Sequence, residues 1–400
     1  MKILYLNYSP SIVQQTRTNG IAEGLRKNGH DITVLNPHRN YSSGYNPKLV
    51  DAPKTKLSGL MKKRETYHSA WTIIIGEVRR FLANLRYLVL ELFYIIKYKP
   101  DWIIARPGFT WSVFLSSKIL LQKTTIDTDG PVMEIFEYMG GGIPEFYLDL
   151  ERLLISQSPS VAVISTEMKR LYSSYGGDPD RIAVCPNAID PTLFHHDIDS
   201  APVKNKHGLT DKTTIGFMGN IQPWHGLPGL LNIFPEIAES YSHVHLLLIG
   251  LDIDWDEIPD GINPRLIDFK DRITCAGRIP HTAMPEYLKA IDVFVLPYPE
   301  TDFFYFSPIK LFEAMGVGCA VVGADIGQTG EVIEDEKDGL LFPAGDYSAM
   351  KNRIIELIEN PNLRNILGEN ASEKIRGEFT WEKSAGKMIS AYEYSYGRGS

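Results

Sequence analysis

The chain has 400 residues, of which 44% are hydrophobic and 22% charged, and its formal net charge is −8. This length predicts two or three domains, and the composition is that of a globular protein rather than a disordered chain. No apolar run reaches the length of a membrane span, and we expect no signal peptide. The three cysteines, Cys185, Cys275 and Cys319, lack metal-type spacing, so we expect buried thiols in a reducing cytoplasm.

The charges are unevenly distributed along the chain. Residues 1–200 carry a balance of +3, whereas residues 201–400 carry −11. Within residues 48–99 there are 11 basic and 4 acidic residues. A localised basic segment in an acidic chain favours an anionic partner surface. We therefore take residues 54–99 as a candidate for contact with an anionic membrane, and we expect no nucleic-acid partner.

The first residues predict the beginning of a doubly wound sheet. Lys2 to Asn7 is a predicted strand, residues 19–28 a helix, and residues 32–35 a second strand. Because strand ends carry the site in such sheets, residues 7–19 are expected to line it. Arg17 is a candidate for an acceptor or phosphate contact, and the alternative is an exposed loop arginine. The absence of G-x-G-x-x-G argues against a dinucleotide at this position.

Residues 69–99 have apolar side chains at helical spacing, interrupted by Glu91. One interpretation is a helix that packs on the sheet. The other is a helix pair at the membrane surface, flanked by a set of basic residues, which are Lys62, Lys63, Arg64, Arg79, Arg80 and Arg86. We favour the packing helix, with a membrane role as an addition.

Two further strands of the first half end in polar residues. The strand from Trp102 ends at Arg106, and the strand from Thr124 continues to Asp129 and Gly130. Carboxylates at the carboxyl ends of parallel strands face the site. Asp129 is therefore a candidate site residue, although Asp-Gly is also a common turn pair. Glu134 follows as an acceptor contact or a solvated residue.

The second half opens with a strand from Thr214 to Gly219, followed by Asn220, His225 and Gly226 before a predicted helix at residues 227–240. A strand that meets a helix through a glycine-containing turn offers backbone N–H groups to a phosphate. Further glycine turns follow later strands, at Gly277-Arg278 and at Gly327-Gln328.

The stretch 302–325 predicts a loop, a short helix and a buried strand. Ser307 suits the N-cap and Pro308 the first helical position. Lys310 lies in the first turn, and Glu313 lies on the same face one turn later. A phosphate can bind this helix start, and the carboxylate can accept hydrogen bonds from a ribose. The alternative is a capped helix with a surface Lys–Glu pair.

The segment from Tyr305 to Asp346 resembles the donor-binding signature of the retaining family-4 glycosyltransferases. Glu313 matches the second Glu of that family's Glu-x7-Glu pattern, and the first falls on Tyr305. The chain is similar instead to a subgroup that carries Pro-Trp-His-Gly and Ser-Pro-x-Lys-Leu-Phe-Glu. The resemblance implies an α/β GT-B fold, in which two Rossmann-like domains face each other across a cleft.

The resemblance implies transfer of a sugar from a nucleotide-diphosphate sugar, with UDP favoured, to a hydroxyl of a glycan or lipid-linked glycan. It places the acceptor on residues 1–195 with a returning helix at 380–396, and the donor on 196–379. It implies no cofactor and no metal. The expected location is cytoplasmic and peripheral on the inner face of the membrane. The candidate residues are catalytic Lys310, His225 and Asp129; donor-binding Gly219, Asn220, Gly226, Arg278, Ser307, Glu313, Gly327 and Gln328; and acceptor-binding Arg17, Arg106 and Glu134.

Two other classes stay open. A GT-B epimerase or hydrolase would use the same donor site without an acceptor. A non-catalytic subunit that binds nucleotide sugar is suggested by the missing first Glu.

Overall fold

The structure is a computed structural model, and it divides into two compact units, Met1–Pro186 with Trp381–Ser400, and Asn187–Thr380. The residues that it describes are 1–7, 12–36, 48–51, 70–106, 112, 115, 122–132, 144–220, 222–255 and 261–397.

Residues 187–195, which the sequence places in the first domain, lie in the second unit. The reason is pairing within that unit. Ile189 forms a parallel bridge with Thr380, and the Asn187 N–H donates to the Ser307 hydroxyl at 2.9 Å. The unit boundaries therefore fall after residues 186 and 380.

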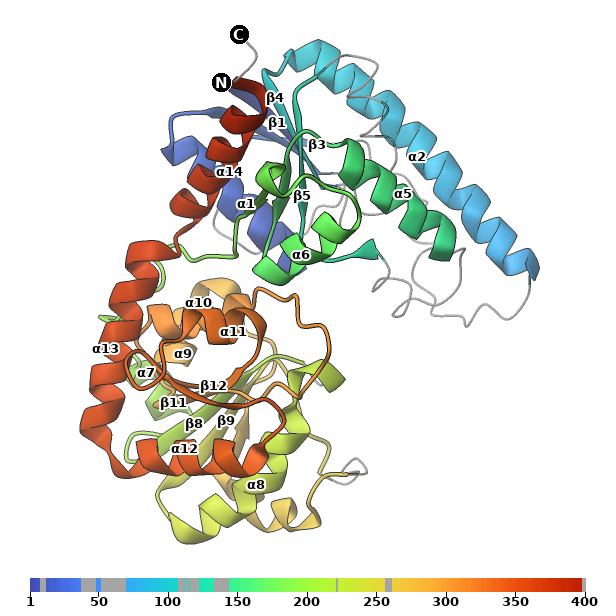
Figure 1. Ribbon diagram of the computed structural model, residues 1–400. Helices are drawn as coiled ribbons and strands as arrows, with labels where there is room; N and C mark the ends of the chain where they lie inside the picture. Colours follow the sequence, from blue (N-terminus) through green and yellow to red (C-terminus); the bar gives the residue numbers. More distant parts are fainter. Residues whose placement is uncertain are drawn as a thin grey trace. The chain divides into compact units, whose positions relative to one another are not determined.

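Within the described residues, the first unit is built on a parallel sheet in the order β3-β2-β1-β4-β5-β6-β7 (Figure 1). Its strands are β1 (Lys2–Asn7), β2 (Asp31–Asn36), β3 (Lys48–Asp51), β4 (Trp102–Arg106), β5 (Thr124–Thr128), β6 (Val161–Val163) and β7 (Ile182–Val184). The central strands β1 and β4 are almost wholly buried. Parallel sheets need such apolar runs because helices cover both of their faces.

The first unit contains five helices in its described residues. They are α1 (Ile12–Lys27), α2 (Ala70–Tyr98), α5 (Pro144–Gln157), α6 (Thr166–Ser174) and α14 (Trp381–Tyr396), with a short 3₁₀ turn η2 (Pro179–Arg181). The sequence predicts α2 well, but it starts α1 at residue 19. The actual start at Ile12 is hidden in the sequence because residues 12–18 are mainly polar and show little apolar periodicity.

Helix α14 packs closely on α1, as Figure 1 shows. Two glycines of α1 permit this approach. A Cβ at Gly20 would lie 2.2 Å from the Trp381 ring, and a Cβ at Gly24 would lie 2.2 Å from the Trp381 carbonyl oxygen. The Ser384 hydroxyl also donates to the Pro186 carbonyl at 2.7 Å. The last helix is therefore part of the first unit.

The second unit contains a parallel sheet in the order β10-β9-β8-β11-β12-β13. In the described part of this unit the strands are β8 (Thr213–Met218), β9 (Val244–Ile249), β10 (Ile273–Cys275), β11 (Val293–Leu296), β12 (Ala320–Asp325) and β13 (Leu340–Pro343). β9 and β11 are buried along their whole length, so the sheet forms the centre of the hydrophobic core.

Helices cover both faces of the second sheet, with α8 and α12 on one face and α9, α10 and α11 on the other (Figure 1). The helices are α7 (Ala201–Lys206), α8 (Leu227–Ser240), α9 (Met284–Lys289), α10 (Ile309–Gly316), α11 (Gly327–Val332), α12 (Tyr347–Glu359) and α13 (Pro361–Glu378), and the 3₁₀ turns are η3 (Pro223–His225), η4 (Pro264–Arg272) and η5 (His281–Ala283). The start and end of α8 coincide with the prediction.

No helix in the described ranges is both long enough and apolar enough to cross a bilayer. Of the candidate membrane segment 54–99, residues 54–69 lie outside the described residues, and residues 70–98 form α2.

Candidate functional site

The candidate site of the second unit lies where β8 and β11 end side by side. β9 and β10 extend the sheet on one side of this pair, and β12 and β13 extend it on the other. In open α/β sheets, ligands bind outside the carboxyl ends of the strands at such a switch point. β8 ends at Met218 and β11 at Leu296, so Gly219 and Tyr298 lie at this place.

The turn from Gly219 to Gly226 requires glycine at both ends. Gly226 has a φ of 65°, and a Cβ there would lie only 1.6 Å from the Pro297 carbonyl oxygen. A Cβ at Gly219 would lie 3.1 Å from Lys310 Nζ and 3.2 Å from His225 Nδ1. The structure therefore brings together four predicted site residues from two distant segments of the chain, Gly219, His225, Gly226 and Lys310.

Lys310 points from α10 into this switch point. Its Nζ is buried and has no hydrogen-bond partner among the described residues. It lies 5.1 Å from the ring centroid of Phe217 and 5.7 Å from that of Tyr298. Burial lowers the pKa of the Lys310 amine to about 7, because the charged form is poorly solvated there. The aromatic faces stabilise a cation but supply no acceptor.

His225 is oriented by the backbone of the same turn. Its Nδ1 lies 2.9 Å from the Asn220 carbonyl oxygen. Burial and the neighbouring Lys310 lower its pKa to about 4, so the ring is neutral at pH 7. Because a carbonyl can only accept, Nδ1 carries the proton and Nε2 presents a lone pair. At neutral pH the His225 ring is therefore uncharged, and the Lys310 amine is only partly protonated.

The start of α10 differs from the prediction. The helix begins at Ile309, and its N-cap is Pro308, with no side-chain cap hydrogen bond. The predicted N-cap residue, Ser307, is 5% exposed. Its hydroxyl accepts from the Asn187 N–H, and its carbonyl accepts from the Asn187 side-chain amide at 2.7 Å. Ser307 thus ties the 187 segment to the helix start instead of capping the helix.

Glu313 is buried and paired, which the surface-pair alternative does not predict. His281 Nε2 lies 2.8 Å from Glu313 Oε1. Burial of His281 opposes its charged form, but the hydrogen bond to Glu313 and the carboxylate charge raise the pKa of His281. The contact with His281 holds one carboxylate oxygen of Glu313 and thereby fixes the orientation of that side chain.

The other donor-site candidates lie at three places. Arg278 is exposed and follows the edge strand β10, two strands away from β8. Gln328 is buried in α11, next to Gly327. A Cβ at Gly327 would lie 2.6 Å from the Phe304 carbonyl oxygen. The Asn220 side chain is exposed, and its carbonyl holds His225.

Tyr305, which stands at the position of the first Glu, is 4% exposed. Its ring packs on Phe306 at 4.4 Å and on Phe303 at 5.4 Å between centroids. The run of aromatic residues is therefore used to build the segment before α10.

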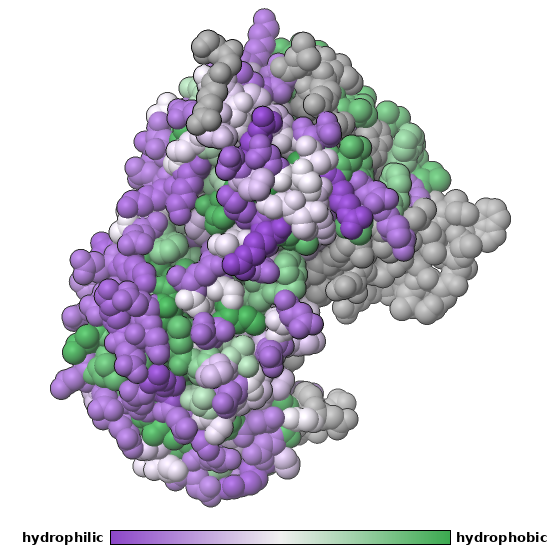
Figure 2. All heavy atoms as spheres, viewed as in Figure 1, coloured by the Kyte–Doolittle hydropathy of each residue, from purple (hydrophilic) through white to green (hydrophobic). Residues whose placement is uncertain are grey.

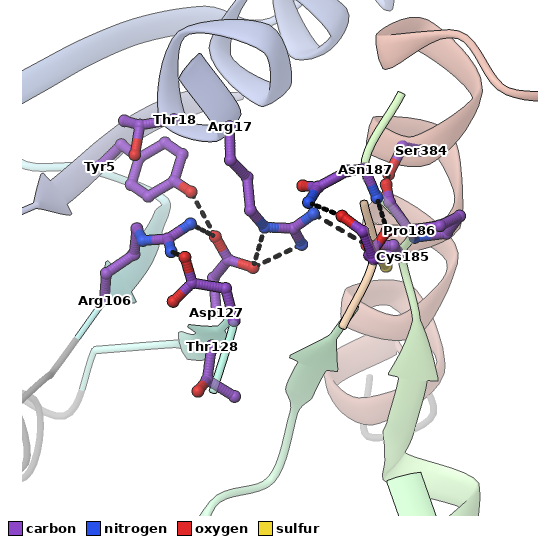
Figure 3. Close-up of polar contacts among 12 residues, drawn as sticks. Tyr5, Arg17, Thr18, Arg106, Asp127, Thr128, Cys185, Pro186, Asn187 and Ser384 are labelled. Atoms are coloured by element: carbon purple, nitrogen blue, oxygen red, sulfur yellow. Dashed lines mark hydrogen bonds and ion pairs between the residues drawn. The ribbon is translucent and has the colours of Figure 1, made fainter. Parts of the chain in front are cut away.

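The first unit holds a buried ionic network at its own switch point, between β1 and β4 (Figure 3). Asp127 Oδ1 accepts from Arg17 at 2.7 Å, and Oδ2 accepts from Arg106 at 3.0 Å. The Tyr5 hydroxyl also donates to Asp127. Arg106 continues to Asp129, at 2.5 Å. Three segments of the chain thus converge on the carboxylate of a fourth.

Arg17 is therefore neither an exposed arginine nor part of a loop. It lies on α1, is 1% exposed, and also donates to the Cys185 carbonyl at 2.9 Å. Burial opposes the charge of Asp127, but the charges of Arg17 and Arg106 keep the pKa of Asp127 below its usual value. In this conformation both arginines are occupied in holding the sheet and helix together.

Asp129 is the most accessible member of the network, with 22% of its side chain exposed. It lies just beyond β5, and the Thr128 hydroxyl donates to the Gly130 carbonyl in a turn at this place. Glu134, the remaining acceptor candidate, lies outside the described residues.

Sequence reasoning misses Tyr5 and Asp127 in the first unit and three residues of the site in the second unit. Phe217 and Tyr298 flank Lys310, and His281 holds Glu313. The signal for the two aromatic residues is their position at the ends of predicted strands, but strand order is needed to place them together. Among the residues that the structure describes, there is no group of three or more His, Cys, Asp or Glu side chains able to hold a metal ion.

Two family descriptions match successive parts of the chain. Residues 14–193 match "Glycosyltransferase Family 4", and residues 212–360 match "Glycosyl transferases group 1". Together they cover most of the chain, and each lies almost wholly within one compact unit.

Curated relatives are similar at low identity. A D-inositol 3-phosphate glycosyltransferase of Segniliparus rotundus is 26% identical over 63% of this chain and 56% of its own length. A phosphatidyl-myo-inositol mannosyltransferase of Mycolicibacterium smegmatis is 26% identical over 60% of this chain and 58% of its own. The chain thus spans little more than half the length of these relatives.

Solved structures match over nearly the whole chain. A sucrose-phosphate synthase from Thermosynechococcus elongatus has a TM-score of 0.71 and 18% identity, with all of both chains covered. Anabaena HepE in complex with UDP-glucose has a TM-score of 0.70 and 17% identity, with 98% of each chain covered. With the two parallel sheets, this likeness identifies the fold as α/β GT-B, as predicted.

Proposed function

We propose that this chain is a glycosyltransferase related to group 1 and family 4, and that it transfers a sugar from a nucleotide-diphosphate sugar to a hydroxyl group. The second unit holds the donor and the first unit the acceptor. The donor is a UDP-sugar carrying a hexose, the sugar configuration is retained, and the acceptor is a glycan or lipid-linked glycan. The reaction takes place on the cytoplasmic side.

One observation carries this proposal: a buried amine without a hydrogen-bond partner among the described residues, at the switch point of the donor unit. Lys310 Nζ lies between two aromatic rings and beside the glycine turn. A diphosphate supplies the anionic acceptor that this amine lacks. Because Nζ is buried, a phosphate reaches it only if neighbouring groups move.

The chemical task is to stabilise the leaving diphosphate while the sugar bond breaks. The diphosphate raises the pKa of Lys310, so the amine becomes charged where negative charge develops. Backbone N–H groups at the start of α10 add to this stabilisation. His225 Nε2 presents a lone pair, and it takes up a proton if a phosphate oxygen comes within hydrogen-bond distance.

The direct test is a thermal-shift screen of nucleoside diphosphates and their sugars, followed by product analysis with the donors that bind. A UDP-sugar should raise the melting temperature, and the product should retain the anomeric configuration. Conversion or hydrolysis of the donor without any acceptor would identify an epimerase or a hydrolase instead.

A second candidate is a binding subunit without turnover, which the buried Tyr305 at the position of the first Glu favours. It predicts donor binding in the thermal-shift screen but no product with any acceptor.

Glu313→Gln should weaken binding of the nucleoside diphosphate about tenfold or more, since a charged acceptor for ribose hydroxyls is lost and the His281 pair is broken. Calorimetry with UDP measures this change. Glu356→Gln, a change at a half-buried glutamate of the same unit that pairs with Arg353, is the matched control and should leave the affinity unchanged. Equal affinities for wild type and Glu313→Gln would exclude the ribose role.

Chelation by EDTA should leave the transferase rate unchanged, because leaving-group stabilisation is assigned to Lys310 and helix-start amides rather than to a cation. The measurement is the initial rate with EDTA and after return of Mg²⁺ or Mn²⁺. A loss of activity that either ion restores would contradict this assignment.

A further inference from the structure

Helix α2 carries an apolar face that the described part of the chain leaves uncovered. Its large hydrophobic side chains are 45–62% exposed, whereas most exposed apolar residues elsewhere are isolated. Figure 2 shows the hydrophobic residues that gather over α2. The exposed residues are Ile75, Val78, Phe81, Leu82, Leu85, Val89, Phe93 and Ile96.

These residues form a single stripe, which we call the α2 stripe. Apart from the adjacent pair Phe81 and Leu82, their spacing of three or four residues places them on one side of the helix. From Ile75 to Ile96 the stripe is about 32 Å long, at about 1.5 Å per residue. The opposite side of the helix faces the unit, with Asn84, Glu91 and Ile95 buried. A stripe of this length is far larger than the isolated apolar residues that are normal on a protein surface.

Basic residues line one edge of the α2 stripe. Arg79, Arg86 and Lys97 are spaced by 7 and 11 residues, so they share one side of the helix. Both glutamates of α2 lie on the inward side. Glu91 accepts from the Ser112 hydroxyl at 2.6 Å, and Glu77 accepts from the Tyr147 hydroxyl. The outward face of α2 therefore combines apolar and positive groups without a carboxylate.

We propose that the α2 stripe docks on an anionic lipid surface, with the helix lying in the plane of the membrane. An apolar face with basic residues along its edge matches the boundary between acyl chains and anionic headgroups. A second copy of α2 fits less well, because it offers no outward carboxylate to the basic row. The proposal does not depend on sugar transfer, and its test needs no turnover.

The test is co-sedimentation of the full chain with lipid vesicles. Vesicles of phosphatidylcholine alone are compared with vesicles that contain about one-third phosphatidylglycerol, at about 0.1 M and about 1 M salt. We expect strong binding to the anionic vesicles at low salt and weaker binding at high salt. Absence of binding to anionic vesicles at both salt concentrations would overturn the proposal.

Two double variants separate the apolar and the charged contributions. Leu82→Ser/Val89→Ser should lower vesicle partitioning about tenfold or more. Arg79→Gln/Lys97→Gln should lower partitioning into anionic vesicles about 25-fold, since each basic residue near the surface contributes about fivefold. Because all four side chains are exposed, the melting temperature should not change, which distinguishes lost docking from lost folding.

Matched controls change exposed residues away from α2. Ile267→Ser/Ile366→Ser and Lys27→Gln/Lys270→Gln should leave partitioning unchanged. If these variants reduce binding as much as the α2 variants, the stripe is not the docking surface. If sedimentation velocity shows a dimer that Leu82→Ser/Val89→Ser converts to a monomer, the stripe pairs with a second copy and the lipid assignment is wrong.

Discussion

Lys310→Met should lower kcat about 10²–10³-fold, the loss expected when one group that stabilises developing negative charge is removed. Methionine ends one atom short of Nζ, so the change removes the amine beside Phe217 and Tyr298 and leaves an unbranched apolar side chain in its place. The measurement is steady-state kinetics with the donor identified by the thermal-shift screen. Lys270→Met, at an exposed lysine of the same unit, is the control.

The same variant should be more stable than the wild type. The pKa of Lys310 is about 7 in the folded chain against 10.5 ordinarily, so folding disfavours the charged amine. As the pH falls from about 10.5 to 7, the unfolded chain binds the proton first, and the wild type loses on the order of 3–5 kcal/mol of stability. The gain from Lys310→Met should therefore be largest at pH 7 and below, and should vanish near pH 10.5.

Taken together, kinetics and denaturation decide the role of Lys310. A slower and more stable variant identifies an amine that is retained for function at a cost in stability. A variant with normal kcat would remove Lys310 from the mechanism. A variant that unfolds more easily than wild type would show that the amine is a structural group.

Asp127→Asn should lower the free energy of unfolding of the first unit by about 3–5 kcal/mol, because Arg17 and Arg106 would remain buried without a counter-charge. The readout is hydrogen exchange of the amides in β1, β4 and β5, which reports on the first unit separately. The same substitution at an exposed pair, Asp149→Asn beside Arg152, is the control and should cost less than about 1 kcal/mol.

The pH dependence gives a second test of this network. The pKa of Asp127 is lowered in the folded chain, so its stabilising contribution is complete above about pH 4 and is lost as the pH falls further. Asp127→Asn should remove this part of the acid unfolding. An effect no larger than that of Asp149→Asn, with acid unfolding unchanged, would show that the network contributes little.

Local pattern was sufficient for several elements. The first strand from Lys2 to Asn7 and the helix from Leu227 to Ser240 coincide with the prediction. Their apolar periodicity and flanking turn residues are encoded within a few positions. The same local reasoning places the N-cap of α10 on Ser307. It fails there because the partner of the Ser307 hydroxyl, Asn187, lies 120 residues away in the sequence.

The sequence by itself determined individual elements such as Lys2–Asn7 and Leu227–Ser240, the glycine turns, and the presence of a lysine and a glutamate on the first turns of one short helix. Only the tertiary structure decided their electrostatic state. Lys310 has an amine pKa near 7 because folding surrounds it with Phe217 and Tyr298. Arg17 became a structural cation because folding places it against Asp127. Residue type and spacing are local, whereas solvation and charge pairing depend on neighbours that the sheet order supplies.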